Sequence, residues 1–257
     1  MPITSLLETA FKWLFLASLV LLAVTFVHKD RLPDPTSFDD LRLEPPLQTP
    51  TERAPFVTQV RDQAYRIAPR YDYELHGVVV SYSDADAIKN IWHHASWQDF
   101  INVRDLCVVW GENVRSGVYH QMAFRNDSWT CWAGWAERTV GERFQMSALA
   151  NNHLLTDDAR LMKTLMAVEP GDQIRLRGVL ADYANLGNGY ARGTSVTRED
   201  TGNGACETIY LDEIEIIRKA NPGVRRLHDF ARWLALTTGV GFLVMLPIAP
   251  VRVRRRR

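Results

Sequence analysis

Chemically versatile side chains are most concentrated in one ten-residue stretch, residues 198–207, which reads REDTGNGACE. In a catalytic interpretation Cys206 is a nucleophile, His153 is its base, and backbone amides bind an oxyanion. In a structural interpretation Thr-Gly-Asn-Gly is a turn, Asp200 accepts amide hydrogen bonds within it, and Cys206 begins a strand as a half-cystine or buried thiol. We favour the turn, because no histidine stands at a recognisable local spacing from the thiol.

The chain has three cysteines, Cys107, Cys131 and Cys206. They allow three different single disulfides, and the sequence does not choose among them. Cysteines that pair are typical of an oxidising compartment. We therefore expect one disulfide and one buried thiol, and this expectation weakly favours export from the cytoplasm.

The adjacent residues His93 and His94 could contribute to a metal site together with His120 or His153. Neighbouring residues point in different directions on a helix or a strand, and no second ligand follows at an i+4 or Cys-x-x-Cys spacing. We expect no metal and no other cofactor.

Four tryptophans, Trp110, Trp129, Trp132 and Trp135, fall within 26 residues. Alternation in a strand would place Trp129 and Trp135 on the same face as Cys131, where they would belong to the core. Trp132 lies on the opposite face and is the expected exposed member, able to stack on a ligand or contact a protein.

Strands and helices must position these residues, and strand patterns dominate the middle of the chain. Alternation and β-branched content predict strands over residues 73–82, 105–110, 117–124, 128–136, 173–181 and 208–217. Helices are predicted over residues 84–92 and 156–168. This pattern predicts an α+β fold, β-rich, with a curled sheet or small barrel of OB-like type between two transmembrane helices.

Two of these strands carry finer signals. Residues 173–181 place Ile174, Leu176, Gly178 and Leu180 on one face, with a sharp bend allowed at the glycine. The last strand changes phase between Leu211 and Ile214. A β-bulge near residues 212–213 would restore a single inward face.

The strand GDQIRLRGVLADY, residues 171–183, looks like a strand of an oligonucleotide/oligosaccharide-binding (OB) type barrel. Together with NNHLL at 151–155 and TSVTREDTGNGACETIY at 194–210, it resembles a group of uncharacterised bacterial membrane-anchored envelope proteins. The resemblance covers about residues 71–217. It implies a location in the envelope and no particular activity.

Two uncharged runs flank the middle of the chain, residues 13–27 and residues 233–251. The second has about the length needed to cross a bilayer, and the first reaches it because its apolar character extends back through Phe11 and Leu6, provided that Lys12 reaches the interface. The first could instead be a signal peptide, although no small-x-small site precedes His28. The second could be a core helix, because it contains Gly239, Gly241 and Pro247, but arginines close it at residues 252 and 254–257. We expect two spans.

Basic residues near the spans give a divided signal for orientation. The short tail carries five arginines, which favours a cytoplasmic C-terminus, whereas basic residues also flank the spans on the other side. Considered with the cysteines, the pattern favours a bacterial inner-membrane protein with a periplasmic central domain. The formal net charge of zero gives no general attraction to nucleic acid.

The expected organisation has four parts. Residues 1–30 form the first span, and residues 31–70, with seven of the twelve prolines, form an extended stalk. Residues 71–217 form the β-rich soluble domain. Residues 218–257 hold an amphipathic helix, the second span and the arginine tail.

The favoured function is a membrane-tethered, extracytoplasmic interaction or scaffold module of the bacterial cell envelope, without catalysis, whose partners are the membrane and other envelope proteins. One alternative is an envelope hydrolase that uses Cys206 or a His/Asp site. The other is a subunit of a membrane complex, suggested by Gly239 and Gly241 as a close-packing helix face.

Overall fold

The computed structural model describes residues 2–40, 43–87, 91–127, 129–200 and 206–248. The chain divides into two compact units. One contains both ends of the chain, Met1–Arg31 and Asn221–Arg257, and the other contains Leu32–Ala220. Each unit is described by itself.

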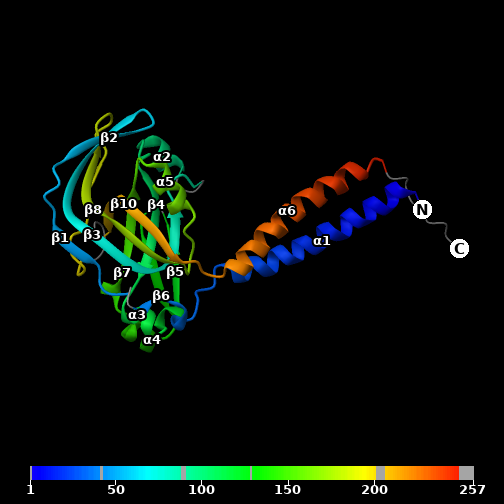
Figure 1. Ribbon diagram of the computed structural model, residues 1–257, viewed down its shortest axis with the longest axis horizontal. Coiled ribbons are helices and arrows are strands. Elements are labelled where there is room, and N and C mark those ends of the chain that lie inside the picture. Colours follow the sequence, from blue (N-terminus) through cyan, green and yellow to red (C-terminus); the bar gives the residue numbers. More distant parts are fainter. Residues whose placement is uncertain (1, 41–42, 88–90, 128, 201–205, 249–257) are drawn as a thin grey trace. The chain divides into compact units, whose positions relative to one another are not determined.

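The terminal unit is an antiparallel pair of long helices, α1 (Ile3–Lys29) and α6 (Pro222–Met245) (Figure 1). Glycines allow the two helices to approach closely: a Cβ at Gly239 would lie 3.1 Å from the Phe15 ring, and one at Gly241 would lie 2.8 Å from the Phe11 ring. The glycine pair of α6 is therefore used in contact with α1.

Within the described part of the chain, α1 is the one helix that is long and apolar enough to cross a membrane, judged by length and composition. The helix α6 also has exposed apolar residues, among them Phe230, Trp233 and Val240, but its first turns carry Arg225 and Arg226. Residues 249–251 of the expected second span and the arginine tail lie outside the described residues.

The unit Leu32–Ala220 has α+β structure. Its large mixed sheet consists of β1 (Leu47–Pro50), β2 (Phe56–Val60), β3 (Gln63–Asp84), β4 (Asn102–Val109), β7 (Leu149–Leu155), β8 (Gln173–Asn185), β9 (Ala191–Arg192) and β10 (Glu207–Arg218). A separate hairpin consists of β5 (Met122–Asn126) and β6 (Cys131–Trp135). The α-helices are α2 (Ile91–Ser96), α3 (Glu112–Arg115), α4 (Arg138–Arg143) and α5 (Ala159–Met166), and 3₁₀ turns cover Pro35–Ser37, Val118–Gln121 and Met146–Ala148.

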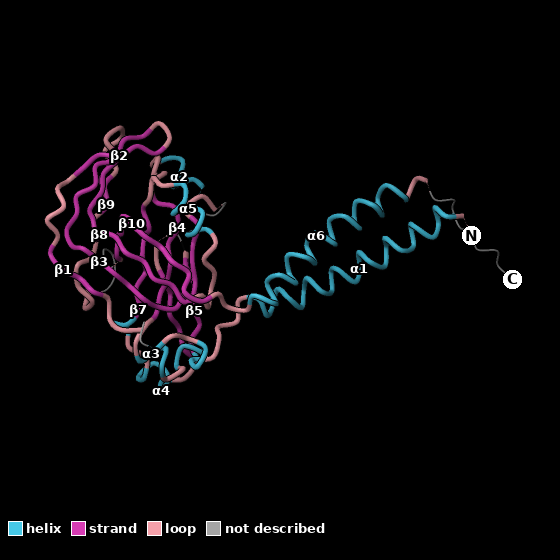
Figure 2. Tube along the Cα trace, viewed as in Figure 1, coloured by secondary structure: helices cyan, strands magenta, loops and turns pink. Residues whose placement is uncertain are grey.

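The large sheet curls until it closes on itself. Antiparallel pairing joins β3 to β4 and β4 to β7, parallel pairing joins β7 to β10, and antiparallel pairing joins β10 to β8 and β8 back to β3. Five strands therefore form a ring, which Figure 2 shows as the dense strand region of this unit. The short strands β1, β2 and β9 extend it at its margins.

The interior of the ring is apolar. Alternate residues of the five strands form its main core, which includes Leu75, Leu106, Leu154, Leu176 and Ile209. The predicted bulge is present, because the register of β10 against β8 shifts between Leu211 and Glu213. At Gly178 the strands approach so closely that a Cβ would lie 2.1 Å from the carbonyl oxygen of Tyr210.

The helix α5 joins β7 to β8 and contributes Leu165 to the core. Arg104 holds its C-terminal end, because the guanidinium Nη1 donates to the carbonyl oxygens of Leu165 at 3.1 Å and Val168 at 2.7 Å. The same side chain pairs with Asp84 at 2.5 Å. A buried arginine thus satisfies carbonyl groups that a helix end leaves without internal donors.

Several stretches differ from the sequence-based expectation. The helix expected over residues 84–92 is displaced, because Asp84 ends β3 and the described helix is α2, Ile91–Ser96. Residues 31–70, expected as a stalk, contain β1, β2 and the first part of β3, and they bury Phe38, Leu43 and Ile67. Pairing with β3 gives this proline-rich segment its hydrogen bonds. Residues 117–124, expected as a strand, begin with a left-handed residue at Gly117 (φ 72°), continue as a 3₁₀ turn and become extended at Met122.

Candidate functional site

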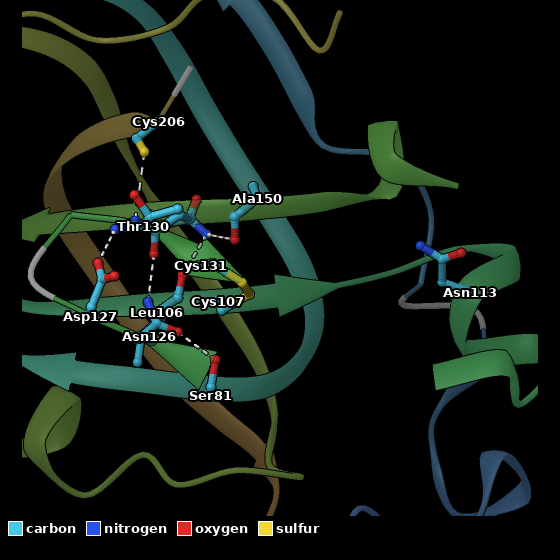
Figure 3. Close-up of a disulfide and its surroundings, with 12 residues drawn as sticks. Ser81, Leu106, Cys107, Asn113, Asn126, Asp127, Thr130, Cys131, Ala150 and Cys206 are labelled. Atoms are coloured by element: carbon cyan, nitrogen blue, oxygen red, sulfur yellow. Dashed lines mark hydrogen bonds between the residues drawn. A yellow bond between two sulfur atoms is a disulfide. The ribbon is translucent and has the colours of Figure 1, made fainter. Parts of the chain in front are cut away.

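A disulfide between Cys107 and Cys131 fastens the β5–β6 hairpin to the outside of the barrel (Figure 3). Cys107 lies on β4 and is fully buried. Hydrogen bonds support the attachment: the Ser81 hydroxyl donates to the side-chain oxygen of Asn126, and the Asn126 amide donates to Asn151 Oδ1 at 2.8 Å. The hairpin therefore covers the outer face of β3, β4 and β7.

Beneath this cover, four polar residues stand in register across four neighbouring strands. Ser83 of β3 is opposite Asp105 of β4, Asp105 is opposite His153 of β7, and His153 is opposite Thr208 of β10. All four side chains are buried. We call these residues the polar row.

Both ring nitrogens of His153 lie close to a charged side chain. Nδ1 lies 2.7 Å from Asp105 Oδ1, and Nε2 lies 2.5 Å from a guanidinium nitrogen of Arg192. Arginine only donates hydrogen bonds, so Nε2 must accept and Nδ1 carries the proton toward the carboxylate. Burial lowers the pKa of His153, and the positive charge of Arg192 acts in the same direction. The neighbouring carboxylate of Asp105 opposes this lowering of the pKa.

Aromatic rings from three separate loops close over the outer end of the polar row. Trp97 lies 5.2 Å from Trp129 and 5.2 Å from Tyr190, ring centre to ring centre, the second pair being stacked at 25°. The Arg192 guanidinium lies 5.0 Å from the Trp129 ring centre. The β3–β4 loop, the β5–β6 hairpin and the β8–β10 segment thus meet at one place.

Several polar atoms in this region lack a hydrogen-bond partner among the described residues. They include Asp99 Oδ1, Asn102 Oδ1 and Arg192 Nη1, all of them shielded from solvent. The other oxygen of Asp99 accepts a 2.8 Å hydrogen bond from the Tyr183 hydroxyl. Burial raises the pKa of Asp99 to about 6, against the opposing effects of Tyr183 and Arg192. Unpaired buried polar atoms call for a bound water or ligand.

Cys206 is a partly buried free thiol at the edge of this region. It contacts the carbonyl oxygen of Trp129 at 3.5 Å and the side-chain amide of Asn151 at 3.6 Å. Burial raises the pKa of the thiol, whereas catalytic cysteines have a lowered pKa. Among the described residues no hydrogen bond joins Cys206 to His153, which the less favoured catalytic interpretation would require.

Asp200 accepts a 2.7 Å hydrogen bond from the Ser195 hydroxyl. The turn residues 201–205 that we expected it to stabilise lie outside the described residues. On the interior side of the barrel, the buried carboxylate of Glu207 pairs with Arg198, which also donates to the Tyr73 hydroxyl at 2.9 Å. Burial raises the pKa of Glu207 to about 7, although Arg198 opposes this shift.

The remaining sequence candidates lie apart from the polar row. Trp132 is 51% exposed on the hairpin. The His94 ring packs edge-on against Phe100 at 5.1 Å, and His120 lies against Tyr119 at 4.2 Å. The side chain of His93 is outside the described part of the chain. In the described residues, no group of three or more histidines, cysteines, aspartates and glutamates is arranged to hold a metal ion.

Sequence reasoning identified His153 and missed its neighbours Asp105 and Arg192. The register of β4 and β7 makes Asp105 a neighbour of His153, but residues 149–155 were not recognised as a strand. Had they been, the alternation of Asn151 and His153 against Leu154 would have been a detectable signal. No protein-family model, curated protein or solved structure matches this chain.

Proposed function

We propose that the protein is a membrane-anchored interaction module of the bacterial cell envelope, with an OB-type barrel that binds another envelope component without chemical turnover. The observation that carries this proposal is the polar row with its aromatic cover; two members of the row, Asp105 and His153, lie on the second and third strands of a closed five-stranded barrel. We place the binding site where other OB barrels bind their ligands, which is an analogy based on the fold alone.

The strand arrangement supports the OB assignment. Counting only the ring, the strands in chain order are β3, β4, β7, β8 and β10, and α5 lies between the third and the fourth. OB barrels bind ligands on the face of strands two and three and with the loops between strands one and two and strands four and five. Here these are β4, β7, residues 85–101 and residues 186–206. They supply His153, Trp97 and Arg192.

The contacts favour binding over catalysis. Each nitrogen atom of His153 already lies close to a charged side chain, and the pKa of the Cys206 thiol is raised rather than lowered. In addition, the unpaired atoms of Asp99, Asn102 and Arg192 offer two acceptors and a donor. Such groups orient a polar ligand or an ordered water.

Anchoring and export are further parts of the proposal. The apolar helix α1 supports a membrane anchor, and the close packing of α6 against it supports a second span. The Cys107–Cys131 disulfide supports an oxidising compartment, which in bacteria is the periplasm. The proposed location is the inner membrane with the barrel in the periplasm.

The binding function is tested by photo-crosslinking in intact cells. A photoreactive amino acid replaces Trp97, and a control chain carries it at Val57, an exposed residue of β2. We expect an adduct of defined mass from position 97 only, abolished by Arg192→Ala in the same chain. Equal adducts from both positions, or none from either, would refute the binding site.

Topology and catalysis are tested separately. In a Cys206→Ser background, Glu199→Cys provides one accessible thiol, and we expect a membrane-impermeant thiol reagent to label it in cells whose inner membrane is intact. Labelling only after lysis would place the barrel in the cytoplasm.

In the otherwise unchanged chain, rapid stoichiometric reaction of Cys206 with an activity-based thiol probe would favour the hydrolase instead.

A further inference from the structure

A series of polar side chains connects Asp99 to His153. Asp99 Oδ2 accepts a 2.8 Å hydrogen bond from the Tyr183 hydroxyl. The rings of Tyr183 and Tyr190 lie 6.1 Å apart, centre to centre. Burial and the charge of Asp99 raise the pKa of Tyr190, whereas Arg192 and a hydrogen bond involving Tyr183 lower it. Arg192 in turn lies 2.5 Å from His153 Nε2. We call these five residues the buried series.

Two atoms of opposite character in the buried series lack a hydrogen-bond partner among the described residues. They are Asp99 Oδ1, an acceptor, and Arg192 Nη1, a donor. The two side chains lie near enough for the charge of Arg192 to lower the pKa of Asp99. The guanidinium nevertheless contacts His153 through its other terminal nitrogen and lies 5.0 Å from the Trp129 ring centre. Two acceptors, His153 Nε2 and Asp99 Oδ1, therefore compete for one guanidinium.

The protonation state of Asp99 decides between these acceptors. A protonated carboxyl group needs no counter-charge, and this state fits the arrangement described here, in which Asp99 is buried with one oxygen unpaired. An ionised carboxylate in the same place is costly unless a charged donor pairs with it. A charge-assisted hydrogen bond to a carboxylate is also stronger than one to an imidazole nitrogen. Ionisation of Asp99 thus draws Arg192 away from His153.

The other titratable or charged groups near Asp99 do not replace Arg192 in this role. They come from the elements packed around it: Arg61 of the β2–β3 turn, Tyr65 of β3, His94 of α2, Asp105 of β4, Tyr183 of β8 and Tyr190 beside β9. Burial lowers the pKa of His94, and Arg61 lies over the Phe100 ring, 4.3 Å from its centre. Asp105 carries a like charge and raises the pKa of Asp99. Arg192 is therefore the cation that an ionised Asp99 attracts.

We propose that proton binding to Asp99 switches Arg192 between two positions and thereby controls the binding site under the aromatic cover. The control of binding rests on the proposed function, whereas the movement of Arg192 does not. When Asp99 is protonated, Arg192 stays against His153 and Trp129, and its Nη1 is available to a ligand. When Asp99 is ionised, the guanidinium pairs with it, and the donor is lost to the ligand. Binding is therefore favoured by acid.

The movement of Arg192 is tested by fluorine NMR on the full chain in detergent micelles, with 5-fluorotryptophan in place of tryptophan. The Trp129 signal is assigned from its loss in Trp129→Phe, and Trp110 of the barrel core is the reference. We expect the Trp129 signal to shift with a midpoint near pH 6, because burial raises the pKa of Asp99 to about 6. The Trp110 signal should stay constant.

Two carboxyl variants assign this transition. Asp99→Asn removes the titrating group at nearly constant size and is expected to abolish the shift of the Trp129 signal. Glu207→Gln removes the other buried carboxyl group with a raised pKa, about 7, and should leave the shift in place. A Trp129 signal that stays constant between pH 5 and 7.5 in the natural chain would overturn the switch. A shift that persists in Asp99→Asn and disappears in His153→Gln would assign the titration to His153 and overturn it as well.

The effect on binding is measured with the photoreactive residue at position 97, in isolated cell envelopes buffered at pH 5.5 and 7.5. We expect at least about fivefold more adduct at pH 5.5, since the protonated fraction of a group with a pKa of about 6 falls by more than this factor over the interval. Adding Asp99→Asn should make the two yields equal. Equal yields without that substitution would overturn the control of binding. If position 97 gives no adduct at either pH, the proposed binding function is refuted, and the Trp129 titration alone decides the Arg192 switch.

Discussion

The strands β4 and β7 have two faces that are both buried but have opposite chemistry. On the inner face, Leu106 and Leu154 pack in the apolar core of the barrel. On the outer face, Asp105 and His153 pair with each other and are covered by the hairpin and by Arg192. Alternating polar residues usually indicate a face exposed to water. Here the polar alternation indicates a second, hydrogen-bonded interior.

The two faces contribute to stability in different ways. Apolar side chains stabilise the fold in proportion to the surface area that they remove from water, and this contribution depends little on the orientation of the contacts. Buried charged and polar groups stabilise the fold only where their partners are well placed, since each unpaired group is costly. Substitutions on adjacent residues of these strands therefore test the distinction directly. The unit Leu32–Ala220 is the material for these stability measurements, because a fragment beginning at Tyr71 would cut β3 in half.

The largest effect is expected from the apolar face. Leu154→Ala leaves a cavity among fully buried neighbours and is expected to lower the free energy of unfolding by about 4 kcal/mol. Urea denaturation followed by circular dichroism measures the loss. Leu154→Met, which keeps most of the volume, serves as the control and should lose far less. A small loss for the alanine variant would mean that the barrel interior collapses around the substitution.

On the polar face, Asp105→Ala removes the carboxylate that lies 2.7 Å from Nδ1 of the buried His153. We expect a loss of about 3 kcal/mol in the same assay. Asp105→Leu tests whether shape alone matters, because it fills the volume but provides no acceptor. If the leucine variant is as stable as the natural chain, the hydrogen bonds of the polar row are not needed for stability. Their role would then lie in binding only.

A pH dependence is expected from Glu207. Its pKa in the folded chain is about 7, above its ordinary value of 4.5, so the folded state binds more protons between these values. Stability from this group is therefore present at low pH and lost as the pH rises through 7. Lowering the pH from 7.5 to 5 should raise the free energy of unfolding by about 2 kcal/mol.

Asp99 adds a shift of the same sign, because its pKa is raised to about 6. Glu207→Gln serves as the control, since it removes the titrating group and keeps its size. The variant should show a flatter profile between pH 5 and 7.5 than the natural chain. An identical profile would show that Glu207 is ionised in the folded state throughout this range.

The smallest effects are expected from the neighbours Thr208 and Ile209. The Thr208 hydroxyl donates to the carbonyl oxygen of Gly193 at 3.0 Å, so Thr208→Val removes one hydrogen bond at constant shape and should cost about 1 kcal/mol. Ile209→Val removes one methylene group from the core at a similar cost of about 1 kcal/mol. A second Thr208 variant, Thr208→Ser, keeps the donor and should lose less than Thr208→Val if the hydrogen bond is responsible.

Local sequence patterns predicted several strands and one register feature correctly. Alternation placed residues 73–82, 105–110, 173–181 and 208–217 in strands, and the phase change after Leu211 located the bulge. The same reasoning missed β7, because Asn151, Asn152 and His153 lower the strand propensity of this segment. In the structure these three polar side chains are nevertheless buried. The same reasoning also predicted that residues 31–70 are extended and unpaired, because prolines lower the strand propensity. In the structure β1 and β2, which lie in this segment, pair with the long strand β3.

The sequence by itself determined the properties that depend on neighbouring residues: the apolar helix near the N-terminus, the β-rich middle and the bulge in β10. Only the tertiary structure decided which cysteines pair, which side chains surround His153, and that Cys206 lies beside Asn151 and Trp129. These contacts join residues that are tens of positions apart. They depend on how the sheet closes and on where the hairpin is attached. Neither can be deduced from the spacing of residues along the chain.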